Sequence, residues 1–220
     1  MLIGNLDRLD NAEKAGKPQP AYLFVDRGEQ LRRLNCHVVY TIPIVLVFSN
    51  ELNPLANRFG IDPQVLPMVI TRYADEALCE PGLELLQQLI LARAFPETLP
   101  SDRLERVGEI IEDLATLDLL CMASGGHVRN LLKLGFSCLQ RMDPPFSRDC
   151  VERVIRQRRN ELWRAITPDE MELLQQVKRE KKARGETSYE VLLKSMFVFE
   201  YRSDDYGHWF DVNPILYDDL

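Results

Sequence analysis

The stretch Ser124-Gly125-Gly126-His127-Val128-Arg129-Asn130-Leu131-Leu132 carries the strongest local signal in this chain of 220 residues. Two adjacent glycines permit a tight backbone turn. Apolar residues then recur at helical spacing, at Val128, Leu131, Leu132 and Leu139. The pattern predicts a helix entered through a sharp turn. Arg129 lies in its first turn, where a planar and always charged side chain is suited to binding a phosphate.

Helical periodicity continues on both sides of this stretch. Before it, apolar residues share one face over 83–90 and recur at helical spacing over 104–117. After it, Pro144-Pro145 is a break, and a third apolar repeat covers 151–166. These segments predict a chain that is mainly helical.

The motif Thr167-Pro168-Asp169-Glu170 predicts the start of another helix. Thr167 is the expected N-cap, Pro168 the first helical residue, and Glu170 the partner that completes a capping box. Gly185 is expected to end this helix.

A small β component is predicted at two places before the C-terminal region. Val38–Ile42 is β-branched and aromatic, with Pro43 at its end. Val65–Thr71 is a second candidate strand, although Pro67 argues against a regular central one.

The C-terminal region changes its period. Tyr189–Met196 predicts a short helix, and Phe197–Tyr201 and His208–Val212 predict two strands around the turn Asp204–Gly207. Trp209 and Phe210 are expected to pack this hairpin onto the helices. Helices followed by a hairpin are typical of a winged helix-turn-helix.

Charge is unevenly distributed along the chain. The net charge is −7 overall. It is −5 over residues 1–140, +4 over 141–184 and −6 over 185–220. An acidic total disfavours non-specific nucleic-acid binding, which needs clustered Lys and Arg. The local +4 leaves room for a small basic surface or for a solvated helix face.

The sequence also argues against a membrane-spanning helix and against a cysteine-based site. The longest apolar run, Val38–Phe48, is far shorter than the ~20 residues of a membrane helix. No signal-peptide pattern is present at Met1, so the expected compartment is the cytoplasm. The five cysteines show no C-x-x-C or zinc spacing and are expected to be buried free thiols. Cys36 and His37 precede a strand, so they are not expected to pair as nucleophile and base.

Four pieces of the sequence, in order, resemble the second half of an AAA+ type P-loop ATPase, near the signal-transduction ATPases. Leu2-Ile3-Gly4-Asn5-Leu6-Asp7-Arg8-Leu9 resembles the tail of a Walker B strand. In the family the first Asp of that motif holds Mg²⁺ and the second acidic residue orients the attacking water. Here Gly4 occupies the metal position and Asp7 the second acidic position.

The remaining pieces of the resemblance supply candidate sensors. Val38–Pro43 resembles the next strand, with Thr41 as the sensor that faces the γ-phosphate. The Gly125-Gly126 turn and Arg129 resemble the start of the lid helix that carries the second sensor arginine. A winged helix often follows that lid. The resemblance therefore implies a partial α/β ATPase core over 1–72, a helical lid over 73–145 and a winged-helix domain over 146–220.

One part of the family pattern is missing. The sequence contains no G-x-x-x-x-G-K-[ST], the loop whose backbone N–H groups and Lys hold the phosphates. We therefore expect this chain alone neither to bind ATP tightly nor to hydrolyse it. ATP and Mg²⁺ are implied only if a partner that carries the P-loop completes the site, or if the chain is a truncated reading frame.

Two other classes of function remain open at this stage, a winged-helix DNA-binding regulator and a protein-interaction adaptor. The expected recognition helix, 188–196, carries one cation, Lys194, and the expected wing tip is Asp204-Asp205. Both features disfavour DNA. Basic residues that can contact only a nucleic-acid backbone are Lys178, Lys181, Lys182 and Arg184. A protein partner or self-association is therefore preferred over DNA.

Overall fold

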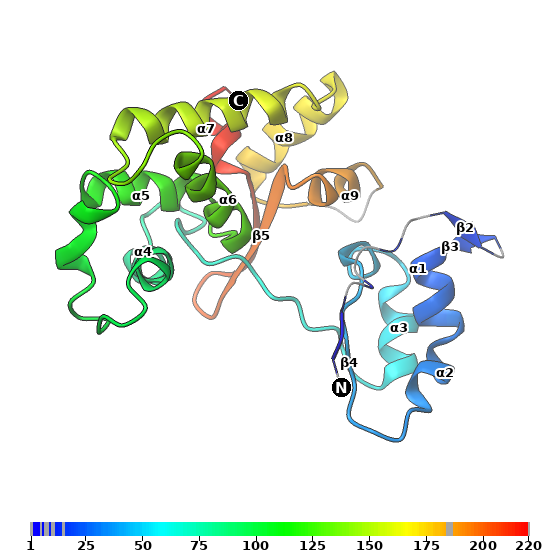
Figure 1. Ribbon diagram of the computed structural model, residues 1–220. Coiled ribbons are helices and arrows are strands. Elements are labelled where there is room, and N and C mark those ends of the chain that lie inside the picture. The colour runs from blue at the N-terminus through cyan, green and yellow to red at the C-terminus, as the bar shows by residue number, and fades with distance from the viewer. Residues whose placement is uncertain are drawn as a thin grey trace. The chain divides into compact units, whose positions relative to one another are not determined.

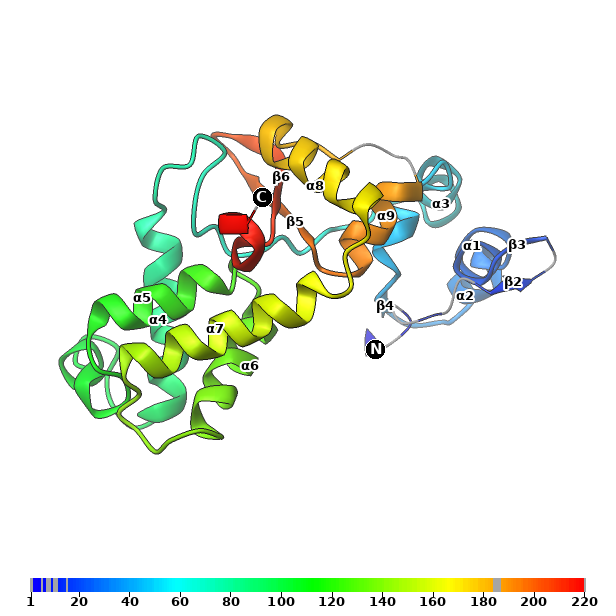
Figure 2. The same cartoon turned by 90° about the horizontal axis from the view of Figure 1, so that it is seen from above.

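The structure is a computed structural model that describes residues 2–4, 6, 9, 12–14, 16–183 and 187–219 (Figures 1 and 2). Helices dominate, and the strands form small two-stranded sheets. This confirms the mainly helical class with a small β component. The chain divides into two compact units, Met1–Leu66 with Arg184–Lys194, and Pro67–Ala183 with Ser195–Leu220.

The first unit contains a short parallel strand pair. β1 (Leu2–Ile3) pairs with β4 (Val39–Tyr40), and the Thr41 backbone N–H donates to the Ile3 carbonyl at 3.2 Å. β2 (Glu13–Lys14) and β3 (Lys17–Pro18) form an antiparallel pair. β4 is the strand predicted at Val38–Ile42, and it is shorter than predicted.

Helices of the first unit surround a small apolar core. They are α1 (Gln19–Ala21), a π-helical turn (Tyr22–Asp26), α2 (Gly28–Arg32), a 3₁₀ helix (Ile44–Leu46), α3 (Leu52–Phe59) and α9 (Thr187–Lys194). The buried core residues are Ala21, Phe24, Val25, Leu46 and Leu55. α9 packs next to the 3₁₀ helix.

The second unit is a set of helices with a hairpin. Its helices are α4 (Glu80–Ala94), a 3₁₀ helix (Leu104–Glu109), α5 (Leu114–Ala123), α6 (Val128–Leu139), α7 (Arg148–Trp163), α8 (Pro168–Glu180) and a C-terminal 3₁₀ helix (Pro214–Asp219). β5 (Val198–Ser203) and β6 (Gly207–Val212) form the antiparallel hairpin. Figure 2 shows the C-terminal turn close to α5 and α7, which it contacts.

Local signals located several elements correctly. The hairpin and the helix after Gly126 are confirmed. Thr167 caps α8 and Glu170 completes the capping box, with the Thr167 N–H donating to Glu170 Oε2 at 2.7 Å. Trp209 is buried as expected, but in the described part of the chain its cluster with Phe199 and Tyr201 is covered by the extended segment at Met68 and Ile70 and not by a helix.

The helical repeat over 104–117 is wrong as a single helix. The chain leaves helical geometry at 111–113, where Ile111 pairs with Phe146 in a parallel bridge. Asp113 then starts α5 as its N-cap, accepting from the Thr116 N–H at 2.8 Å. A capping carboxylate and a distant backbone partner outweigh the apolar periodicity.

Two further expectations need correction. Segment 65–71 is extended but is not a strand, because its N–H groups bond to different elements, Met68 to Glu200 and Val69 to Gly126. α8 ends at Glu180 and not at Gly185, which lies outside the described residues. Lys181 adopts a left-handed conformation with φ of 54° and terminates the helix.

The extended segment 67–72 is held between two glycines. An added Cβ at Gly82 would lie 1.7 Å from the Ile70 carbonyl oxygen. One at Gly126 would lie 1.7 Å from the Val69 carbonyl oxygen. We call this arrangement of Gly82, Gly126 and residues 67–72 the glycine clamp. Only residues without a side chain allow the backbones to approach this closely.

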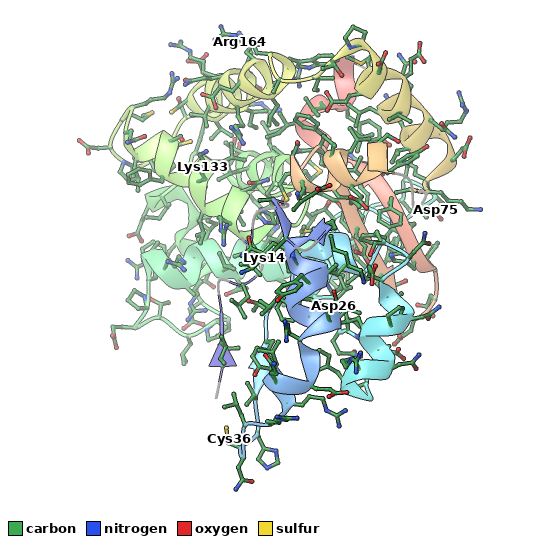
Figure 3. All side chains as sticks on the ribbon, turned by 90° about the vertical axis from the view of Figure 1, so that its right-hand side faces the viewer. Lys14, Asp26, Cys36, Asp75, Lys133 and Arg164 are labelled. Carbon is green, nitrogen blue, oxygen red and sulfur yellow. The ribbon has the colours of Figure 1, made fainter. Side chains whose placement is uncertain are left out.

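The cysteines are free among the described residues, and four of them are buried. Cys36 is the exception, because it is exposed (Figure 3). The expectation of buried thiols is thus wrong for Cys36, which follows α2 in a surface loop.

Candidate anion-binding site

The residues predicted for a Walker B-like strand end lie in the first unit. Asp7 is outside the described residues. Gly4 directly follows β1 and Thr41 directly follows β4. Because β1 and β4 are parallel, their carboxyl ends, and with them Gly4 and Thr41, lie at the same edge of the pair.

The predicted glycine turn is buried and well bonded. Gly125 and Gly126 both have positive φ, at 61° and 76°. The Ser124 hydroxyl donates to the Cys121 carbonyl at 2.6 Å and accepts from the Gly126 N–H at 3.1 Å. The Tyr201 hydroxyl donates to the Gly125 carbonyl at 2.8 Å. This turn fixes where α6 begins.

His127 is the N-cap of α6. Its Nδ1 accepts from the Asn130 N–H at 3.1 Å, so in the neutral ring the proton is on Nε2. Burial lowers the pKa of His127, a side-chain hydrogen bond with Asn130 acts to raise it, and the charge of Arg129 lowers it further. His127 is therefore a neutral cap at pH 7.

Arg129 is exposed in the first turn of α6. Among the residues that the structure describes, no carboxylate forms an ion pair with its guanidinium. The rigid turn before it and the missing partner leave this cation available to an anion.

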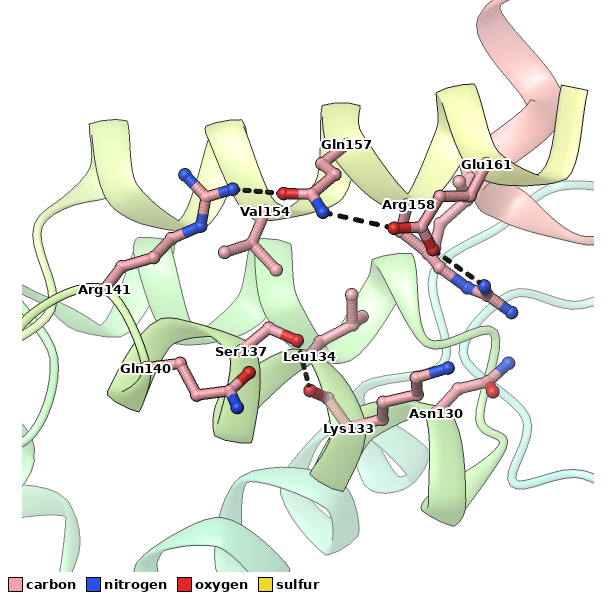
Figure 4. Close-up of a pocket in the computed structure, with 11 residues that line it drawn as sticks. Asn130, Lys133, Leu134, Ser137, Gln140, Arg141, Val154, Gln157, Arg158 and Glu161 are labelled. Carbon is pink, nitrogen blue, oxygen red and sulfur yellow. Dashed lines mark hydrogen bonds and ion pairs between the residues drawn. The ribbon is translucent and has the colours of Figure 1, made fainter. Parts of the chain in front are cut away.

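A groove of about 450 Å³ continues from this helix start, between α6 and α7 (Figure 4). Its floor is apolar, formed by Leu134, Val154 and Ile215. Its walls are polar and carry three cations and one carboxylate. These wall residues are Asn130, Lys133, Ser137, Gln140, Arg141, Gln157, Arg158 and Glu161.

Hydrogen bonds order one wall of the groove. Arg141 donates to Gln157, and Gln157 donates to Glu161 Oε1 at 3.1 Å. Arg158 donates to Glu161 Oε2 at 3.0 Å and, as the largest cause, lowers the pKa of that carboxyl. Glu161 is thus ionised and engaged, and the groove keeps a net positive charge.

The outer face of α7 extends the positive surface. A hollow of about 410 Å³ is lined by polar residues alone, Arg141, Arg153, Arg156, Gln157, Asn160, Glu161 and Arg164. Figure 3 labels Lys133 and Arg164 on the two helices concerned. We call Arg153, Arg156, Gln157, Asn160 and Arg164 the α7 stripe. Sequence reasoning missed this stripe, although its spacing along one helix face was readable.

The basic run assigned to nucleic-acid contact is largely occupied instead. Lys178 donates to the Tyr217 carbonyl at 2.9 Å, and Lys181 donates to Asp211 Oδ2 at 2.8 Å and to the Tyr217 hydroxyl at 2.6 Å. Lys182 is exposed, and Arg184 lies outside the described residues. Two lysines of the run, Lys178 and Lys181, are therefore not free to contact a polyanion, whereas α6 and α7 carry further exposed cations.

The Lys181–Asp211 pair is nearly buried, with side chains 15% and 14% exposed. Burial raises the pKa of Asp211, although Lys181 opposes this. Burial also acts to lower the pKa of Lys181, but its bonds to Asp211 and Tyr217 leave it raised. Together with Glu76, these residues form a charged cluster that joins loop, helix end and hairpin.

The predicted wing tip and recognition helix are acidic or nearly neutral. Asp204 and Asp205 are exposed in the β5–β6 turn. Lys194 is exposed at the end of α9, and Glu190 is half-buried in that helix.

Comparison with known protein families, with curated proteins and with solved structures finds no match to this chain. Within the described part of the chain, no helix is long and apolar enough to cross a membrane. The same residues contain no group of three or more acidic, His or Cys side chains placed to hold a metal ion.

Proposed function

We propose that this chain is the nucleotide-sensing and interaction portion of an AAA+-like ATPase in the cytoplasm, and that the phosphate-cradling loop lies outside these residues. Arg129 is the proposed sensor of the phosphates. The observation that carries the proposal is its position, exposed and without a carboxylate partner among the described residues, directly after a buried glycine turn.

Further features support this assignment. Thr41 and Gly4 lie at one edge of a parallel strand pair, the arrangement expected of sensor and Walker B strands. α7, α8, α9 and the β5–β6 hairpin follow one another in the order expected of a winged helix, although α9 belongs to the first unit and the others to the second. We therefore retain a partial ATPase core over 1–72, a lid over 73–145 and a winged helix over 146–220 as parts of the proposal.

The chain's own residues are suited to sensing a phosphate and not to holding a nucleotide. The sequence has no phosphate loop, and Gly4 replaces the metal-binding Asp. A hydrogen bond from Thr41 in the first unit, or from Arg129 in the second, to a charged group contributes ~1–3 kcal/mol. A millimolar ligand already requires about 4 kcal/mol. In this proposal ATP and Mg²⁺ are therefore bound by the phosphate loop outside these residues, and this chain contacts only the phosphates.

Nuclear magnetic resonance titration of the ¹⁵N-labelled chain tests this proposal. We expect MgATP and tripolyphosphate to shift amide signals at 125–133 with dissociation constants of about 1 mM or weaker. Adenosine is expected to produce no shift, because the contact is to phosphate alone.

Variants make the same titration specific. Arg129→Gln is expected to abolish the shifts, and Arg93→Gln, at an exposed arginine in the last turn of α4, to leave them unchanged. Micromolar binding of ATP, or shifts that persist in Arg129→Gln, contradicts the proposal.

The α7 stripe favours a second candidate function, an adaptor that binds an acidic segment of a partner protein. Three arginines and two amides share the stripe, and the hollow beside it has no apolar lining residue. Guanidinium groups bind carboxylates in bidentate geometry. A nucleic-acid backbone is the alternative occupant of the same cations.

Fluorescence anisotropy with labelled decaglutamate and with a duplex DNA of equal length distinguishes these occupants. We expect the peptide to bind more tightly, with an affinity that falls as salt rises. Arg153→Gln with Arg156→Gln should weaken it about fivefold or more, since each exposed ion contributes up to ~1 kcal/mol. Arg93→Gln with Arg202→Gln, two exposed arginines outside α7, is the matched control. Tighter binding of DNA than of the peptide contradicts the adaptor.

A further inference from the structure

A second cavity, of about 390 Å³, lies on another side of the second unit. It is enclosed by the loop at 71–76, by α5 and α7, by the hairpin and by the C-terminal 3₁₀ helix. Its volume is within the range of small-molecule sites. None of the residues assigned above to the α6–α7 groove lines it except Ile215.

Half of the lining of this cavity is apolar. The apolar residues come from α5, α7, β6 and the C-terminal turn and are Leu119, Met122, Ala123, Ile155, Val212, Pro214 and Ile215. Polar residues line the rest, among them Arg159, whose Nε donates to the Ile215 carbonyl at 2.8 Å. A ligand with an apolar body is stabilised by leaving water for the apolar part of this lining.

An exposed cation, Arg72, also lines the cavity. Arg72 donates from Nη1 to the Glu76 carbonyl at 3.2 Å, and its Nη2 lies 3.9 Å from Met122 Sδ. These contacts hold the guanidinium over the apolar lining. Within the described residues, Arg72 forms no ion pair with a carboxylate.

The two carboxylates at the cavity are already engaged by another cation. Lys181 lies 2.8 Å from Asp211 Oδ2 and 3.5 Å from Glu76 Oε1. Asp211 therefore has its counterion within the cluster, and Glu76 has a longer ion pair with the same ammonium. The charge of Arg72 is left for a group that enters the cavity.

We propose that this cavity binds a small carboxylate with an apolar body of medium length, and that Arg72 pairs with the carboxylate while the body contacts the apolar lining. Planar guanidinium groups bind carboxylates through two parallel hydrogen bonds. An uncharged molecule of the same shape lacks that pair, and a carboxylate without an apolar body lacks the interior contacts. Neither fulfils both requirements of the site.

The Met122 methyl group offers a position-specific readout, because its sulfur touches Arg72 in the cavity wall. The full-length chain is labelled with ¹³C at the methyl groups of its six methionines. The Met122 signal is assigned with Met122→Leu. The chain is then titrated in parallel with octanoate, octanol and acetate.

We expect octanoate to shift the Met122 signal in a saturable manner, with a dissociation constant below about 1 mM. Octanol should bind at least about tenfold more weakly, because it lacks the charged hydrogen bonds. Acetate should give no saturation. Arg72→Gln is expected to weaken octanoate by about tenfold, Arg72→Lys by less, and Arg93→Gln not at all.

A filling variant provides a second test. Leu119→Trp places a large ring in the cavity and should abolish the Met122 shift. Circular dichroism shows whether this variant folds, and if it does not, Arg72→Gln decides alone, since Arg72 is exposed. No Met122 shift with octanoate, or equal affinity in the wild-type chain and Arg72→Gln, overturns the proposal.

Discussion

Replacing Gly126 with alanine is expected to lower the free energy of unfolding of the second unit by about 3–5 kcal/mol. Two costs combine at this position. The backbone has a φ of +76°, which an L-residue adopts at a cost of about 1–2 kcal/mol. The new Cβ would also lie 1.7 Å from the Val69 carbonyl oxygen, so one backbone must move away from the other.

Two control variants separate these costs. Gly207 has a similar φ of +71° with nothing within 4 Å of an added Cβ, so Gly207→Ala should lose only about 1–2 kcal/mol. Gly82 contacts Ile70 at 1.7 Å without a positive φ. Gly82→Ala should lose about 2 kcal/mol, because a clash of about 3 kcal/mol is partly offset by the better helix propensity of alanine, about 1 kcal/mol.

Urea unfolding followed by circular dichroism measures all three variants. The glycine clamp requires the loss in Gly126→Ala to exceed that in Gly207→Ala by about 2 kcal/mol or more. Equal losses in these two variants would mean that only the backbone angle matters and that residues 67–72 are not held by close contact.

The glycine clamp also shows that local sequence patterns predict single elements well but do not predict contacts between distant segments. The glycine turn, the helix after it and the capping box of Thr167 are local features, since each is set by residues within one helical turn. These were predictable from the sequence. The contact between this turn and Val69 was not predictable, because neither segment has a sequence pattern that indicates the other as its partner.

The same distinction accounts for the wrong elements. The apolar repeat of 104–117 is real, but Ile111 pairs with the backbone of Phe146, a partner that helical periodicity cannot reveal. Segment 65–71 has strand-like composition, yet its neighbours are one turn and one strand edge. In both cases tertiary hydrogen bonds outweigh local preference.

For the candidate site, the sequence singles out Arg129, and it names the basic residues of 178–184 as possible nucleic-acid backbone contacts. In the structure Lys178 and Lys181 bind Tyr217 and Asp211, residues more than one element away. Arginines and acidic residues alternate along α7, and three pairs form within the helix, Arg148 with Glu152, Arg153 with Asp149 and Arg158 with Glu161. Only the helical turn places Arg153, Arg156 and Arg164 on one face.

The second large effect is expected at Lys181. Lys181→Met should lower the free energy of unfolding at pH 7 by about 3–5 kcal/mol, because it leaves the buried Asp211 carboxylate without its counterion. Lys182→Met is the matched control at the adjacent exposed lysine, with an expected change within about 0.5 kcal/mol.

The pH dependence gives this prediction its sign. The pKa of Asp211 is already raised by burial, so near its ordinary value of 3.8 the folded state binds a proton more readily than the unfolded chain. Stability contributed by this group therefore falls as the pH rises through that window. Removing Lys181 raises the pKa of Asp211 further and widens the pH range over which stability depends on this group. The loss of unfolding free energy in Lys181→Met should therefore shrink as the pH is lowered from 7 towards 4.

The double variant Lys181→Met/Asp211→Asn isolates the charge itself. Asparagine has the shape of aspartate without its ionisation, so the double variant should recover most of the stability lost at pH 7 and lose the excess pH dependence. Urea unfolding at several pH values measures both. If Lys181→Met is as stable as Lys182→Met, or if its deficit is independent of pH, water and not Lys181 neutralises Asp211. The charged cluster would then not hold the loop at Glu76 to the hairpin, and a free Lys181 would return to the set of cations available to a polyanion.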